Sequence, residues 1–218
     1  MLRQAFHSTR YIRTATVASS AYTTVSRGTA RPAIWQAVEK GVGPKELERL
    51  IYVLGGSVNV CKPLTGETPV ELAIKRHSPP LIVRLLLHAG AQTSKRVDKD
   101  GSSLLHLAAE KSSDPKIIEM LMRAGLKPSH RNFRLETPVH VAARVNGNPK
   151  ILETLLSRDP KLDLVLTVNA MGQCPLDVAH NHNVFGVLER KGGATGLSTY
   201  DWSPIFPQSR FRWGSSLE

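Results

Sequence analysis

Apolar residues in the middle of the chain follow the spacing of two short amphipathic helices. Residues 101–110 place Leu104, Leu107 and Ala108 on one side of a first helix, and residues 117–122 provide the apolar side of a second. The Ser-Ser-Asp-Pro turn between them ends one helix and begins the next. The pattern therefore predicts a helix–turn–helix unit.

This unit recurs on both sides of the central copy. Aligned on Pro69, Leu104, Pro138 and Pro175, successive copies start 35, 34 and 37 residues apart. A period near 34 residues with two helices per copy is typical of a solenoid, in which each unit packs on its neighbours. Residues 31–54 predict a degenerate first copy that caps the stack, with a good amphipathic second helix. The last copy predicts a short second helix that ends at residues 190–193.

The start of each copy carries a sequence signature. Residues 137–143 read Thr-Pro-Val-His-Val-Ala-Ala, and residues 104–109 keep all but the Thr-Pro pair. Glu71 replaces the His in the copy that begins at Thr68, and residues 174–177 read Cys-Pro-Leu-Asp. On these residues the chain resembles the ankyrin-repeat family. The resemblance implies an all-α ankyrin-repeat solenoid of about five helix–turn–helix units, with short β-hairpin-like finger loops along one edge and extended termini.

The solenoid interpretation makes specific core residues testable. Leu107, Leu121, Val141 and Leu155 fall on the apolar sides of their helices and are predicted to be buried. The resemblance also implies that His106 and His140 are structural residues that bond nearby backbone.

Composition divides the chain into three parts: an extension at 1–30, the repeat domain at 31–193 and a second extension at 194–218. The first 38 residues contain five arginines, many Ser and Thr and no acid, since Glu39 is the first acidic residue. This composition is typical of a mitochondrial transit peptide. The alternative is a disordered basic N-terminus of a cytosolic protein. We expect a protein of the mitochondrial matrix, or of the matrix face of the inner membrane.

The finger loops are rich in cations, in a chain whose formal net charge is +11. The expected partner-binding residues are Lys95, Arg96, Lys99, Lys127, Arg131 and Arg134. Acidic residues in these loops are few, so the cations predict an acidic partner, either a protein or RNA phosphates. The alternative is that they are solvated loop charges.

The C-terminal extension is unusually aromatic. It holds five of the chain's 12 aromatic residues, interspersed with two arginines. The expected partner-binding residues there are Tyr200, Trp202, Phe206, Arg210, Phe211, Arg212 and Trp213. Because disordered segments are normally poor in aromatics, the segment should dock on something. Two interpretations stay open: it binds another protein, or it folds back over the last repeat as a cap.

No motif in the sequence predicts an enzyme or a cofactor. There is no phosphate-binding glycine loop, no nucleophile elbow and no paired-carboxylate motif. Cys61 and Cys174 are too far apart for a zinc or redox motif, and His180 and His182 lack a third ligand. No apolar run is long enough to span a membrane, although association with a membrane complex stays open.

These observations predict a non-catalytic scaffold subunit that contacts proteins within a large mitochondrial assembly, such as an oxidative-phosphorylation complex. The alternative is a component of the mitochondrial ribosome, or of another ribonucleoprotein, that contacts RNA phosphates through the basic fingers.

Overall fold

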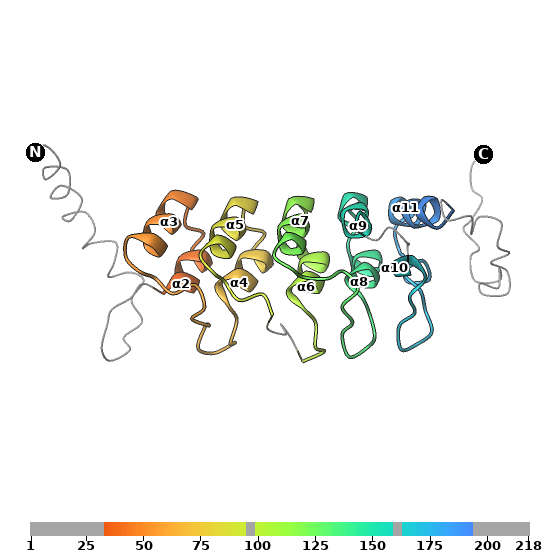
Figure 1. The fold of residues 1–218 in the computed structure, drawn as a ribbon, viewed down its shortest axis with the longest axis horizontal. Helices are drawn as coiled ribbons and strands as arrows, with labels where there is room; N and C mark the ends of the chain where they lie inside the picture. Colours follow the sequence, from red (N-terminus) through yellow and green to blue (C-terminus); the bar gives the residue numbers. More distant parts are fainter. Residues whose placement is uncertain (1–32, 95–98, 159–162, 194–218) are drawn as a thin grey trace, which may run out of the picture.

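Short helices stacked in two layers make up the computed structural model, which describes residues 33–94, 99–158 and 163–193 (Figure 1). The inner layer contains α2 (Ile34–Glu39), α4 (Pro69–Lys75), α6 (Leu104–Lys111) and α8 (Pro138–Val145). The outer layer contains α3 (Pro44–Tyr52), α5 (Pro80–His88), α7 (Pro115–Arg123), α9 (Pro149–Leu156) and α11 (His182–Gly193). Each helix packs on its counterpart in the next repeat. The described residues contain no strand, and the expected all-α solenoid of stacked helix pairs is confirmed.

Local sequence explains where the inner helices begin. Thr68 and Glu71 form a reciprocal capping box at the start of α4, and Thr137 and His140 form one at the start of α8. Each pair satisfies two backbone N–H groups that a helix leaves without an intrahelical acceptor. Proline occupies the first turn of both helices, where its missing N–H costs nothing.

The core lies between the two layers. All four predicted core residues, Leu107, Leu121, Val141 and Leu155, are buried, so this prediction is confirmed. Alanines at positions such as Ala108 and Ala142 are almost fully buried on the inner helices, where their small side chains let α4, α6 and α8 approach closely. The register read from the hydrophobic pattern is therefore correct.

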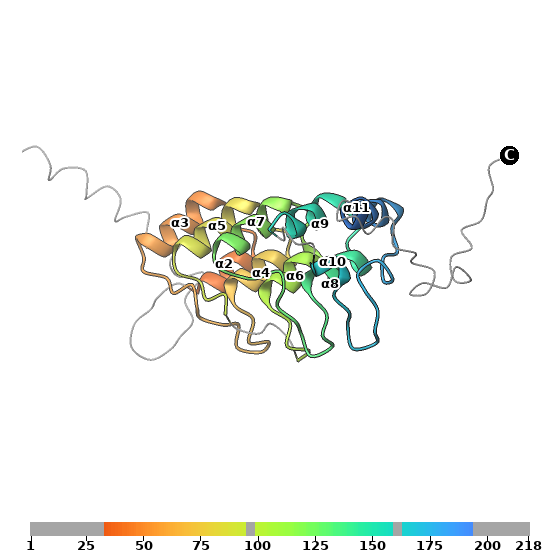
Figure 2. The ribbon, with the colours of Figure 1, turned by 45° about the vertical axis from the view of Figure 1, so that its right-hand side comes forward.

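The finger loops run from each outer helix to the next inner helix and all project to the same side of the stack (Figures 1 and 2). In three of them a backbone hydrogen bond joins the two sides of the loop. These bonds run from Lys62 N to Glu67 O at 2.8 Å, from Asn132 N to Glu136 O at 3.0 Å, and from Asn169 N to Gln173 O at 2.9 Å. Finger-like loops along one edge therefore match the expectation.

The fifth repeat differs from its prediction in two ways. Residues 175–178 form turns instead of a first helix, because Cys174 at the capping position lacks a hydroxyl that could accept from the N–H of Asp177. The expected short second helix is wrong, since α11 extends over 12 residues. Leu, Glu, Arg and Lys favour helix in this segment and outweigh the single Gly186 within it, so the helix continues to the Gly192-Gly193 pair. The short helix α10 (Asp163–Leu166) fills the longer connection before it.

Candidate partner-binding surface

Backbone hydrogen bonds join neighbouring finger tips. Phe133 N donates to Asp100 O at 2.8 Å, and Ala170 N donates to Arg134 O at 2.9 Å. The side chains of Arg134 and Asp100 add an ion pair of 3.2 Å across the same two fingers. Three consecutive fingers are therefore held in one row.

Two buried histidines tie this row to the inner helices. His106 Nε2 lies 3.0 Å from Glu136 O, and His140 Nε2 lies 3.2 Å from Gln173 O. Because a carbonyl oxygen can only accept, Nε2 carries the proton in both rings, and Nδ1 is left to accept from the N–H of the capping residue. Each histidine thus connects its own repeat to the next finger, in agreement with the structural role expected for both residues.

Burial lowers the pKa of His140, although the bond to the Gln173 carbonyl opposes this shift in part. The ring is therefore neutral near pH 7. A neutral ring is the form that both donates from Nε2 and accepts at Nδ1, which the link between repeats requires.

The expected basic site residues fall into three groups. Lys99, Lys127 and Arg131 are exposed and form no ion pair within the residues that the structure describes. Arg134 is exposed and pairs with Asp100. Lys95 and Arg96 lie outside the described residues. The three unpaired cations are available to a partner.

Acidic residues around the fingers are already neutralised. Glu136 is buried and accepts from Arg144 at 3.0 Å, and Glu67 pairs with Lys75. Glu39 pairs with Lys62 at 2.7 Å, and the hydrogen bond from Lys62 lowers the pKa of this carboxyl. The described finger loops therefore present a net positive charge.

The fingers also carry exposed apolar side chains that were not predicted from the sequence. The exposed fractions are 93% for Leu64, 69% for Phe133 and 82% for Met171. Leu64 and Phe133 lie four residues before Thr68 and Thr137, which cap the following inner helices, and Met171 lies three residues before Cys174 at the corresponding place. That spacing is the signal that could have revealed them, but without the tertiary structure an apolar loop residue cannot be separated from a buried one.

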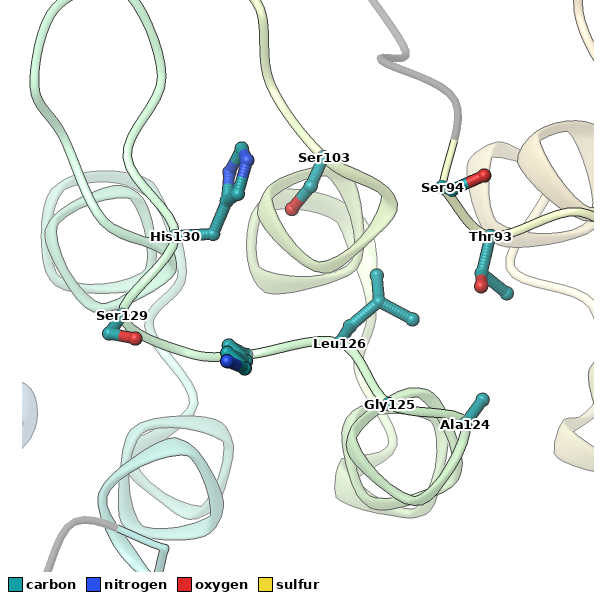
Figure 3. Close-up of a pocket in the computed structure, with 9 residues that line it drawn as sticks. Thr93, Ser94, Ser103, Ala124, Gly125, Leu126, Ser129 and His130 are labelled. Carbon is teal, nitrogen blue, oxygen red and sulfur yellow. The ribbon is translucent and has the colours of Figure 1, made fainter.

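A hollow of about 370 Å³ lies between the finger that precedes α6 and the finger that precedes α8 (Figure 3). Thr93 and Ser94 line one side, Ser129 and His130 line another, and Ser103 stands at the start of α6. The His130 ring meets the His106 ring edge-on, with centroids 5.9 Å apart. A second hollow of about 380 Å³ opens on the other side of the same segment, and Lys127 borders both. The two are related grooves between successive repeats.

The remaining candidates for chemistry have structural explanations. Cys61 and Cys174 are free thiols, and burial raises the pKa of Cys174 to about 11, which makes it a poor nucleophile. His180 and His182 are exposed at the turn and the helix end where we expected them. Within the described ranges, no group of three or more His, Cys, Asp or Glu side chains could hold a metal ion. None of the described helices is long and apolar enough to cross a membrane.

The expected C-terminal site lies outside the described residues. This applies to every residue named there: Tyr200, Trp202, Phe206, Arg210, Phe211, Arg212 and Trp213.

Comparison with protein families agrees with this architecture. The family model described as ankyrin repeats (3 copies) matches residues 34–132. The matched repeats and the stacked helix pairs together show an all-α ankyrin-repeat fold, and repeats of this kind generally serve as non-catalytic modules for contacts with other proteins. A comparison with curated proteins finds no match.

Proposed function

We propose that this protein is a non-catalytic scaffold subunit that holds partner proteins within a large mitochondrial assembly, such as an oxidative-phosphorylation complex. The observation that carries the proposal is the row of linked fingers with three unpaired cations. A solenoid of this kind offers an extended surface suited to gripping other macromolecules.

The charge of the fingers defines the kind of surface that fits them. Lys99, Lys127 and Arg131 form no ion pair within the described residues, because the described acids of the fingers are all paired with other cations. An acidic protein surface would supply the missing partners and would orient the scaffold as it approaches.

The mitochondrial part of the proposal is supported by composition. Residues 1–38 carry arginines, serines and threonines without an acid, as import signals do. The matrix, or the matrix face of the inner membrane, is the compartment that this signal would reach.

A ribonucleoprotein, such as the mitochondrial ribosome, is the second candidate assembly. The same unpaired cations favour it, because Lys and Arg bind RNA phosphates and release counterions as they do so. A phosphate contact predicts a steep fall of affinity with salt and loss of the complex after ribonuclease treatment.

The test compares two variants of equal charge by gradient co-sedimentation of the full chain from mitochondrial lysate. The finger variant carries Ala at Lys99, Lys127 and Arg131. The control carries Ala at Lys45, Lys116 and Lys150, which are exposed cations without ion pairs on outer helices of the described structure. We expect only the finger variant to leave the heavy fractions, with its melting temperature unchanged because surface charges contribute little to stability. Equal behaviour of the two variants would show that the finger cations are merely solvated.

A further inference from the structure

The finger tips present a repeated arrangement that partner binding through the cations does not explain. Leu64 and Phe133 occupy equivalent places at the turns of two fingers, and Met171 lies one residue further along the turn of a third, yet 69% or more of each residue is exposed. Single exposed apolar residues are normal on soluble proteins. Three such residues in the turns of separate fingers form a pattern, because the fingers project to the same side of the stack (Figure 2). We call these three residues the tip row.

The fold holds part of the tip row in register. The bonds from Phe133 N to Asp100 O and from Ala170 N to Arg134 O lock the last fingers to one another. His140 anchors the base of the finger that carries Met171 through its contact with Gln173 O. The tips therefore project together as parts of one edge.

The charges of the described fingers that form no ion pair are positive. Lys99 and Arg131 are exposed and unpaired within the described chain, whereas Asp100 is paired with Arg134. Glu67 and Glu136 at the ends of their turns are paired with Lys75 and Arg144. The edge thus combines protruding apolar side chains with uncompensated cations.

These two properties favour a lipid surface over a protein partner. A protein interface concentrates its binding energy in a contiguous, closely packed centre, but the tip-row residues stand on separate turns with polar residues between them. A fluid headgroup region accepts separate apolar side chains at any spacing, and long cationic side chains beside them can reach anionic headgroups. We propose that the tip row docks this protein on a membrane surface that contains anionic lipids, with Leu64, Phe133 and Met171 entering the headgroup region.

The test is sedimentation of the full chain with vesicles, either of phosphatidylcholine alone or of phosphatidylcholine with an equal part of phosphatidylserine. The tip variant combines Leu64→Ser, Phe133→Ser and Met171→Ser. The control combines Tyr52→Ser and Val53→Ser, which remove exposed apolar side chains at the end of α3 in the outer layer. Far-UV spectra and melting temperatures establish that both variants stay folded.

We expect the unaltered chain to prefer the anionic vesicles by about tenfold, and the tip variant to lose about tenfold in affinity for them, since both charge and apolar burial contribute. The control should bind like the unaltered chain. The double variant Lys99→Glu and Arg131→Glu should bind anionic vesicles more weakly at low salt.

Three results would overturn the proposal. One is the absence of binding to either kind of vesicle. Another is a tip variant that binds as well as the unaltered chain, which would assign vesicle binding to a different segment, such as the basic residues 1–38. The third is a tip variant that loses a protein partner in the gradient experiment while its vesicle binding is unchanged, which would assign the tip row to a protein.

Discussion

His140 donates a hydrogen bond from Nε2 to the backbone carbonyl of Gln173, 33 residues later in the chain, at 3.2 Å. The same ring accepts at Nδ1 from the N–H of Thr137. One side chain therefore caps its own helix and holds the next finger. His106 makes the equivalent pair of contacts one repeat earlier, with Ser103 N and Glu136 O.

Protonation of His140 should make the free energy of unfolding depend on pH. Burial lowers its pKa below the ordinary value of 6.5, so the unfolded chain takes up the proton at a higher pH than the folded chain does. Stability is then fully present above about pH 6.5 and falls as the pH drops through and below that value. Glutamine at position 140 can keep the cap at Thr137 but cannot titrate. We expect His140→Gln to cost about 1 kcal/mol at pH 8, for the lost bond to Gln173, and to flatten the fall in acid.

Urea unfolding between pH 8 and pH 5 measures both effects. His88→Gln, on an exposed position of α5, is the control and should follow the unaltered chain. Parallel pH profiles for His140→Gln and the unaltered chain would refute the assigned role of His140.

Leu135 occupies a backbone conformation that suits glycine. Its φ is 56°, and the equivalent residues of the other fingers are Gly66, Gly101 and Gly172, with φ of 68°, 72° and 71°. A left-handed conformation costs a residue with a Cβ roughly 1–2 kcal/mol. Asparagine tolerates it better without the backbone entropy of glycine, so Leu135→Asn should raise the free energy of unfolding by roughly 0.5–1 kcal/mol.

The denaturant midpoint of unfolding, measured for Leu135→Asn and for the control Phe133→Asn, tests this prediction. Phe133 is also exposed in this finger but does not have a positive φ, so its substitution should leave the midpoint nearly unchanged. A lower midpoint for Leu135→Asn would mean that the leucine side chain contributes more than its backbone strain costs.

Leu121 is fully buried in α7, between the two layers. Leu121→Ala removes apolar contacts and leaves a cavity, so it should cost roughly 2–5 kcal/mol of stability. Chemical unfolding measures the loss, and Leu81→Ala on the exposed side of α5 should cost far less. A change within error at Leu121 would contradict the packing register.

Residues 1–38, fused to a fluorescent reporter, should carry it to mitochondria. Replacing Arg3, Arg10 and Arg13 with Glu should abolish import, because the membrane potential that draws the positive segment inward then opposes it. Microscopy and fractionation measure the outcome, with Lys at the same positions as a charge-preserving control. A reporter that stays cytosolic would refute the proposed compartment.

Deletion of residues 199–218 separates the two interpretations of the aromatic extension. If Trp202, Phe206 and Trp213 anchor the protein to a partner, the truncated chain should melt normally but leave its assembly. Calorimetry and gradient sedimentation measure the two properties. A large fall in melting temperature with the assembly retained would show instead that the segment caps the last repeat.

Much of the fold could be predicted from the sequence, because helix caps and the apolar sides of helices depend on residues that are close together in the chain. The cap formed by Thr137 and His140 spans three residues, and the burial of Leu121 follows from the helical period, so both could be predicted. The fifth repeat was predicted less well, because Cys174 and Asp177 depart from the pattern and the outcome there depends on packing against α9.

Contacts between distant parts of the chain decided the candidate surface. Arg134 pairs with Asp100, 34 residues away, which removes one of the six expected cations from the unpaired set. Lys99 and Arg131 form no ion pair in the described chain, because Asp100 and Glu136 pair with Arg134 and Arg144 instead. The sequence alone does not show that Leu64 and Met171 are exposed. Their exposure follows from their places in the turns of the fingers. Local pattern specifies helices and caps because their partners lie within one turn, whereas charge pairing and exposure depend on which repeats become neighbours.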